Sequence, residues 1–184
     1  MQSCVEVRSL ACVQGKRTTL QDVDLVLAPG QVHGVLGPRW AGKTTLLRVL
    51  AGELAGSAGS ARMPASVLLV SDDGGTPIEA RLDPATRRRV ALARAVASGP
   101  DLLLIDEPAT GFDLDTTAAT RSLVLRYAAQ GGTVVWASRR LDAFMNLAAG
   151  VTLLADGRIR YSGSAEALAA RALEGLVLRL RHAA

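Results

Sequence analysis

The sequence of 184 residues predicts an α/β fold, with a mainly parallel sheet flanked by helices and a small antiparallel β part near its N-terminus. Three observations support this prediction. Short, almost uninterrupted apolar runs alternate with helical segments, which is typical of parallel strands joined by helical crossovers. A glycine-rich loop lies between one such strand and a helix, and another strand ends in two carboxylates. We expect one domain over residues 1–184, because this length lies in the normal single-domain range.

The expected elements follow from the apolar pattern. Two short antiparallel strands come first. Strands are then expected at residues 32–36, 67–71, 102–107 and 133–138. Helices are expected at residues 44–50, from 83 onward, at 116–130, between the strand at 133–138 and the closing hairpin, and at 164–181. A closing hairpin turns at Asp156-Gly157, a residue pair that favours tight turns. Small and glycine-rich residues predict loops at 52–59 and 72–77.

Residues 37–45 carry the clearest chemical pattern. They fit G-x-x-x-x-G-K-[ST], in which backbone N–H groups surround phosphate oxygens at the start of a helix. The chain has only two lysines among 21 basic residues, and one of them, Lys43, stands where the motif requires a lysine. Lys43 would reach the β and γ phosphates of a nucleotide, and Thr44 would hold Mg²⁺. The expected binding residues are Gly37, Pro38, Arg39, Trp40, Ala41, Gly42, Lys43, Thr44 and Thr45.

A second motif is the apolar strand at residues 102–107, which ends in Asp106 and Glu107. Ligands of parallel sheets bind at the carboxyl ends of the strands, so both carboxylates are expected to border the phosphate site. Asp106 would position Mg²⁺, directly or through water. Glu107 is the candidate general base for the water that attacks the γ-phosphate. An acidic pair at a strand end could by itself also be only a cap for the next helix.

Further segments surround these two motifs. They are Pro29-Gly30-Gln31, Val90-Ala91-Leu92-Ala93-Arg94-Ala95, Pro100-Asp101, Asp106-Glu107-Pro108, Gly111-Phe112-Asp113 and Asp156-Gly157-Arg158-Ile159. In this order, and over nearly the whole chain, they resemble the ATP-binding-cassette family, the nucleotide-binding domains of ABC transporters. The resemblance implies a P-loop NTPase fold that binds ATP and Mg²⁺.

The chain departs from this family between its two main motifs. In the family, a long helical subdomain separates the phosphate loop from the acidic strand and receives the membrane partner. Here Lys43 and Asp106 are only 63 positions apart, so we expect that subdomain to be largely missing. The family's signature loop, which caps the ATP of a second subunit, aligns with residues 82–86. Asp83 would set a negative charge against that phosphate and Pro84 removes a backbone donor, although Asp-Pro is a good helix start.

Five other positions differ from the family's residues around the nucleotide. Arg139 stands at the switch histidine; its guanidinium can neutralise phosphate but cannot shuttle a proton at neutral pH. Asp72 replaces a glutamine that senses Mg²⁺, and its carboxylate could still approach the metal. Val13 aligns near the aromatic residue that stacks on adenine, so base stacking is expected to be weaker. Arg39 either contacts a phosphate or points to solvent, and Trp40 costs backbone strain if the loop needs a positive φ there.

The net charge of +4 does not by itself indicate a nucleic-acid partner. The one basic run, at residues 87–89, forms either a solvated helix face or a contact with an acidic partner or anionic headgroups. Aromatic residues that could stack on bases are almost absent, so we expect no nucleic acid. No apolar run approaches the roughly 20 residues of a membrane span. With only two cysteines, we expect a cytoplasmic protein, placed by its partners at the inner face of the cell membrane.

These features predict an ATP-binding subunit of an ABC-type transporter, with hydrolysis of ATP to ADP and phosphate dependent on Glu107. Asp83 would face both nucleotides of a symmetric pair. We therefore expect a heterodimer with an intact second subunit, rather than a homodimer, and a membrane permease as a further partner. The alternative is a degenerate ATP-binding regulatory or scaffold protein without turnover, which Arg139 favours and Glu107 disfavours. A soluble cassette acting in translation or DNA repair is a third possibility.

Overall fold

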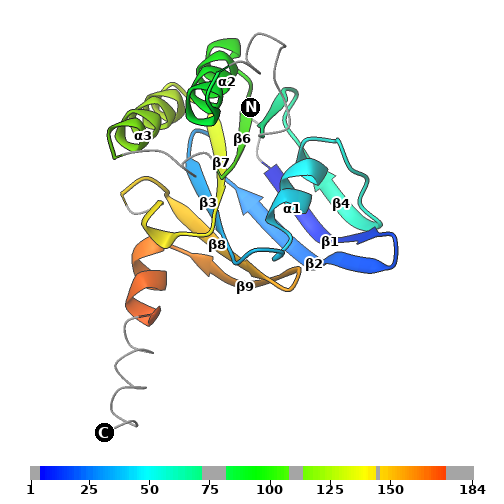
Figure 1. Ribbon diagram of the computed structural model, residues 1–184. Coiled ribbons are helices and arrows are strands. Elements are labelled where there is room, and N and C mark those ends of the chain that lie inside the picture. The colour runs from blue at the N-terminus through cyan, green and yellow to red at the C-terminus, as the bar shows by residue number, and fades with distance from the viewer. Residues whose placement is uncertain (1–4, 72–81, 108–113, 144–145, 173–184) are drawn as a thin grey trace, which may run out of the picture.

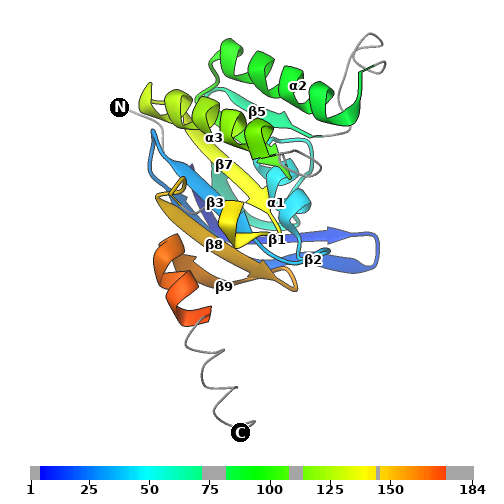
Figure 2. The ribbon, with the colours of Figure 1, turned by 60° about the vertical axis from the view of Figure 1, so that its left-hand side comes forward.

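The computed structural model describes residues 5–71, 82–107, 114–143 and 146–172. Helix α1 (Lys43–Leu50) lies between two sheets, as Figure 1 shows, whereas α2 (Pro84–Ser98) and α3 (Leu114–Ala129) cover the opposite face of the larger sheet. The view in Figure 2 places α2 and α3 side by side over that face. These elements form a layered α/β fold, as predicted.

The larger sheet has six strands in the order β5-β6-β7-β3-β8-β9. Their bounds are β5 Val67–Val70, β6 Leu102–Asp106, β7 Thr133–Ser138, β3 Val32–Leu36, β8 Gly150–Ala155 and β9 Arg158–Gly163. The first five strands run parallel to their neighbours, and β9 pairs antiparallel with β8. The mainly parallel sheet and the closing hairpin are therefore both confirmed.

The smaller sheet is antiparallel, with the order β2-β1-β4. The expected antiparallel pair of N-terminal strands is confirmed, but the strands are longer than expected, because β1 (Val5–Gln14) has 10 residues and β2 (Arg17–Leu27) has 11. The sequence also did not predict β4 (Ala58–Arg62), whose first two residues fall in the loop expected at 52–59. All five residues of β4 are exposed, so no apolar alternation marks this strand, and its pairing with β1 holds it in place.

The two faces of the larger sheet are buried by different partners. Leu102 and Leu104 of β6 belong to the core that contains α1 and the smaller sheet. Leu103 and Ile105, on the other face of the same strand, pack with residues of α2 and α3. This burial on both faces explains the uninterrupted apolar run of β6. Strand β7 pairs in parallel with β6 on one side and with β3 on the other, so the carboxyl ends of these strands lie close together.

Helix α2 begins as its sequence predicts. Asp83 has an extended backbone, its carboxylate accepts a hydrogen bond of 3.0 Å from the Thr86 backbone N–H, and Pro84 is the first helical residue. The Thr86 hydrogen bonds lower the pKa of Asp83. The helix ends at Gly99, whose φ of 62° suits a residue without a side chain. Asp83 and Pro84 therefore form a complete helix cap.

His33 lies within β3, opposite Gly150 of the neighbouring β8. Its Nε2 atom is 2.9 Å from Thr152 Oγ1, and a side chain at position 150 would lie 3.1 Å from its Nδ1 atom. Burial lowers the pKa of His33 to about 4. The imidazole is therefore neutral near pH 7 and fills the space that Gly150 leaves in the sheet.

Several predictions fall on parts of the chain outside the described residues. Asp72 and the whole of the expected loop at 72–77 belong to residues 72–81, which are not described. Residues 165–172 are helical, as expected, whereas the remainder of the predicted helix at 164–181 lies beyond them. Among the described helices, none has the length and apolar character needed to cross a membrane.

Candidate functional site

The phosphate-loop motif connects β3 to α1, as its sequence requires. Two of its glycines touch other elements closely: a Cβ on Gly37 would lie 2.3 Å from the Leu154 carbonyl oxygen, and one on Gly42 would lie 2.7 Å from the Thr19 carbonyl oxygen. Gly42 also has a φ of 104°. The Ala41 carbonyl oxygen accepts a hydrogen bond of 3.1 Å from the backbone N–H of Gly157. The loop is thus fixed against β2 and the β8–β9 turn.

Trp40 and Arg39 project from the middle of this loop. Trp40 has a φ of 67°, in the left-handed region that favours glycine, so the backbone strain considered for this position is present. Its side chain is 75% exposed. The Arg39 guanidinium lies 5.6 Å from the centre of the Trp40 ring, a cation–π contact. The two side chains therefore stack on each other at the rim of the site.

Lys43 is folded back into the phosphate loop. Only 7% of its side chain is exposed, and its Nζ atom donates hydrogen bonds of 2.9 Å and 3.0 Å to the carbonyl oxygens of Gly37 and Pro38. Burial lowers the pKa of Lys43, and the nearby carboxylates of Glu107 and Asp106 oppose that shift. A buried ammonium held only by neutral carbonyls and nearby carboxylates is well suited to bind phosphate oxygens.

Thr44 and Asp106 bring the two sequence motifs into direct contact. The Thr44 hydroxyl donates a hydrogen bond of 2.6 Å to Asp106 Oδ2. The other carboxylate oxygen, Oδ1, is buried and has no hydrogen-bond partner among the described residues. A hydroxyl beside a carboxylate with an unsatisfied oxygen fits Mg²⁺, which binds a few protein oxygens and takes its other ligands from phosphates and water. These residues therefore fit the ion that the motif implies.

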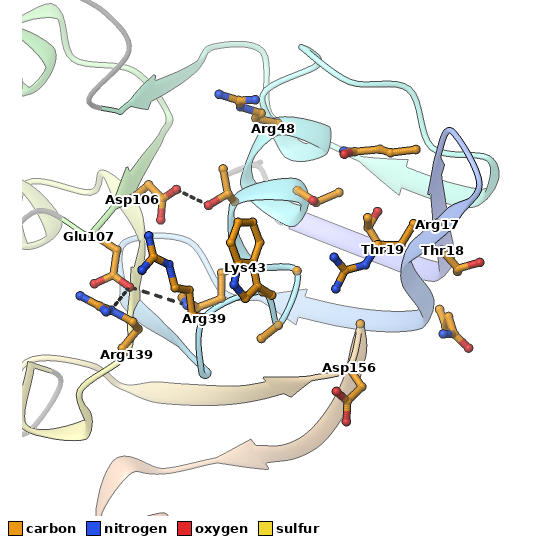
Figure 3. Close-up of a pocket in the computed structure, with 18 of the residues that line it drawn as sticks. Arg17, Thr18, Thr19, Arg39, Lys43, Arg48, Asp106, Glu107, Arg139 and Asp156 are labelled. Carbon is orange, nitrogen blue, oxygen red and sulfur yellow. Dashed lines mark hydrogen bonds and ion pairs between the residues drawn. The ribbon is translucent and has the colours of Figure 1, made fainter.

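Glu107 follows directly after β6 and has a φ of 47°, in the left-handed region. Its backbone N–H donates a hydrogen bond of 3.0 Å to the Ala137 carbonyl oxygen of β7. The Oε1 atom lies 3.3 Å from Arg139 Nε and 3.6 Å from Lys43 Nζ. Arg139 comes directly after β7, so three neighbouring strand ends supply this cluster of charges, which Figure 3 shows.

These side chains share a cleft of about 850 Å³. Of the predicted residues it contains Arg39, Trp40, Ala41, Gly42, Lys43, Thr44, Thr45, Asp106, Glu107 and Arg139. Gly37 and Pro38 act through the carbonyl oxygens that hold Lys43, and Asp72 lies outside the described residues. Val13 does not line the cleft.

Sequence reasoning missed the other residues that line the cleft, which are Gln14, Arg17, Thr18, Thr19, Gln21, Arg48, Arg88, Asp156 and Gly157. Most of them come from the β1–β2 and β8–β9 hairpins. The Asp-Gly turn was recognised in the sequence, but a turn signal does not tell which cavity a hairpin reaches. No local pattern marks Arg17 as part of the site.

Comparisons with known proteins find relatives among ABC transporter proteins. A family model described as ABC transporter matches residues 20–69. The aliphatic sulfonates import ATP-binding protein SsuB 1 of Paracoccus denitrificans is 32% identical, over 84% of this chain and 81% of that protein. The cytochrome c biogenesis ATP-binding export protein CcmA of Sphingopyxis alaskensis is 29% identical, over 70% of this chain and 86% of its own length.

Solved structures support the same fold. The structure of an ATP-binding subunit of an ABC transporter has a TM-score of 0.82 and 16% identity, and covers 97% of this chain and 100% of that chain. A nucleotide-free ATP-binding cassette from an ABC transporter has a TM-score of 0.77 and 17% identity, with 88% and 91% of the two chains covered. The predicted P-loop NTPase fold is therefore confirmed.

Proposed function

The chain belongs to the family of ABC transporter ATP-binding proteins, and on that premise we propose that it binds Mg-ATP in the cleft beside the phosphate loop. One observation carries the proposal. The Thr44 hydroxyl and the Asp106 carboxylate, 62 positions apart in sequence, meet at 2.6 Å with one oxygen of Asp106 still unsatisfied. Two motifs that each suggest part of a Mg-nucleotide site thus form one site.

In this proposal each residue has a separate task. The Lys43 ammonium leaves the carbonyls of its own loop and binds the β and γ phosphates, whose negative charge compensates its burial. Thr44 and Asp106 hold Mg²⁺, which neutralises phosphate charge when bound. The backbone N–H groups at the start of α1 surround the remaining phosphate oxygens.

Hydrolysis is assigned to Glu107. Its carboxylate would take a proton from water as the water oxygen bonds to the γ-phosphorus and the bond to the ADP oxygen breaks. In the structure, Lys43 Nζ and Arg139 Nε lie 3.6 Å and 3.3 Å from this carboxylate. The negative γ-phosphate would draw both cations toward itself and leave the Glu107 carboxylate free to contact the water.

A partner subunit is needed to complete the site. Asp83 uses its carboxylate to cap α2, and Pro84 has no backbone N–H to offer. A second copy of this chain would therefore bring a negative charge toward the nucleotide. We favour a heterodimer in which an intact subunit caps the ATP bound here, with a membrane permease as the third partner and a position at the cytoplasmic face of the membrane.

The test is Mg-ATP binding and turnover by the purified chain, with Lys43→Ala and Glu107→Gln as variants. We expect the wild type to bind, Lys43→Ala to lose binding, and Glu107→Gln to bind without turnover. If Glu107→Gln turned over ATP at the wild-type rate, Glu107 would not be the general base. A wild type that does not bind Mg-ATP would overturn the proposal as a whole.

A second candidate is an ATP-binding regulatory or scaffold subunit without turnover. The ion pair between Glu107 and Arg139 favours it, because this carboxylate then contacts two cations where a general base would contact water. The same experiment separates the two functions. Tight binding without turnover, in the wild type and also with an added intact ABC subunit, would support the second candidate.

A further inference from the structure

The cleft continues past the phosphate loop to the β1–β2 hairpin. Arg17 is the first residue of β2 and pairs with Gln14 across the turn, and both residues line the cleft. Figure 3 shows the Arg17 side chain extending from the hairpin toward the interior of the cleft, on the side opposite Asp106 and Glu107. The hairpin thus places a cation at the end of the cleft that lies away from the acidic strand ends.

Arg17 differs from several neighbouring residues in how its polar group is used within the described part of the fold. Three other residues at this end are engaged: the Thr19 hydroxyl donates to the Cys12 carbonyl oxygen at 3.1 Å, the Gln21 amide oxygen accepts from Arg158 at 2.8 Å, and Asp156 lies 3.7 Å from Arg160. In the described part of the chain, Arg17 makes no ion pair or side-chain hydrogen bond. Its guanidinium is available to a ligand.

Among the described residues, no aromatic side chain lines this end of the cleft. Among the residues that line the cleft the one aromatic is Trp40, which belongs to the phosphate loop and stacks with Arg39. A guanidinium is planar and delocalised, and it stacks on bases as an aromatic ring does. Arg17 therefore offers the kind of surface that a nucleotide base needs, at the end of the cleft away from the phosphates.

We infer that Arg17 binds the nucleoside end of the nucleotide by stacking its guanidinium on a purine base. This inference rests on the proposed Mg-ATP function, in which Lys43 and the loop N–H groups hold the phosphates. The Gln14 side chain, beside Arg17 across the turn, offers an amide donor and acceptor to the edge of the same base. Arg17 thus contributes to the affinity for ATP through the base. Inorganic triphosphate has no base and would not gain this contribution.

The experiment compares Mg-ATP with inorganic triphosphate and Mg²⁺, a probe that has the phosphates without the nucleoside. Binding of both is measured by calorimetry for the wild type, Arg17→Ala, Arg17→Lys and Lys16→Ala. Lys16 is the matched control, since it lies in the same turn and carries the same charge but does not line the cleft. Both residues are exposed, so the fold should tolerate these changes, and thermal unfolding checks this.

We expect Arg17→Ala to weaken Mg-ATP binding about fivefold, the order of a weak stacking contact on a base, and to leave inorganic triphosphate binding unchanged. Arg17→Lys should lose most of the same affinity, because lysine keeps the charge but lacks the plane. Lys16→Ala should bind both probes as the wild type does.

Three results would overturn the inference. They are an equal loss for both probes in Arg17→Ala, full Mg-ATP affinity in Arg17→Lys, and an unchanged Mg-ATP affinity in Arg17→Ala. The first would mean that Arg17 contacts phosphate, and the second that it acts only through charge. Failure of the proposed function looks different, because the wild type itself would then bind neither probe.

Discussion

The carboxyl edge of the larger sheet and the start of α2 use their polar residues in opposite ways. At the sheet edge, buried strands hold Lys43, Asp106 and Glu107 so that their charged groups meet in one cleft. At the start of α2, Asp83 gives its carboxylate to Thr86 within the same turn, and Pro84 has no N–H to give. The charged groups of the first region face a cleft where a ligand can bind, whereas the polar groups of the second region only stabilise the start of a helix.

In the resemblance described above, one subunit of the family supplies the phosphate loop of a nucleotide site and a second subunit supplies the signature loop. The two regions compared here correspond to these two parts. The chain's own part retains a lysine, a hydroxyl, a carboxylate with an unsatisfied oxygen and a candidate base. The part that would face a partner's nucleotide is an ordinary helix cap. We therefore expect mutations at the sheet edge to change ligand binding, and mutations at the start of α2 to change only stability.

The largest effect is expected for Lys43→Ala. This change removes the one buried ammonium of the phosphate loop, and truncating a buried charge partner costs about 4 kcal/mol, or about a thousandfold in affinity for Mg-ATP. Trp40 fluorescence can report binding, since its ring is exposed at the rim of the cleft and Trp136 is buried. Lys16→Ala is the control. Near-normal Mg-ATP binding by Lys43→Ala would contradict the role proposed for Lys43.

The second effect concerns the strand that carries the phosphate loop. The pKa of His33 is about 4 in the fold against a usual 6.5, so the unfolded chain takes up the proton first as the pH falls. The free energy of unfolding therefore includes the full contribution of neutral His33 above pH 6.5. This contribution, about 3 kcal/mol, is lost as the pH falls from 6.5 to about 4. Urea unfolding of the wild type and His33→Gln across this range measures the difference, and parallel pH profiles would contradict the prediction.

The smallest effect is expected for Asp83→Ala. Loss of the cap should lower the Tm by about 3 °C for a chain of this size. Mg-ATP binding by the isolated chain should stay unchanged, because Asp83 does not line the cleft. Asp83→Asn, which can still accept the Thr86 hydrogen bond, should keep the wild-type Tm. A change in nucleotide affinity in either variant would mean that the start of α2 takes part in the chain's own site.

Much of this site could be predicted because its residues carry local signals. The phosphate loop must follow a strand and open a helix, and the apolar run of β6 predicts where Asp106 and Glu107 emerge. The cap of α2 was equally visible in Asp83 and Pro84. In each of these cases the residues that form the feature are neighbours in the sequence, so their types and spacing predict it.

The features that were missed depend on contacts between distant segments. β4 has no buried face and exists through its backbone pairing with β1, so its composition resembles a loop. Arg17 enters the cleft because the β1–β2 hairpin crosses next to the phosphate loop, where Gly42 packs on Thr19. The Glu107–Arg139 ion pair likewise requires β6 and β7 to be neighbours. Strand order and hairpin reach are set by tertiary packing.

The proposed Mg-nucleotide site at Thr44 and Asp106 can be tested by ATP titration of the wild type and Asp106→Asn, with Mg²⁺ and with EDTA. Asparagine keeps the shape and the hydrogen bond to Thr44 but loses the charge that holds a cation. We predict that Mg²⁺ tightens ATP binding about tenfold in the wild type and scarcely at all in Asp106→Asn. Equal responses to Mg²⁺ in the two proteins would contradict this account.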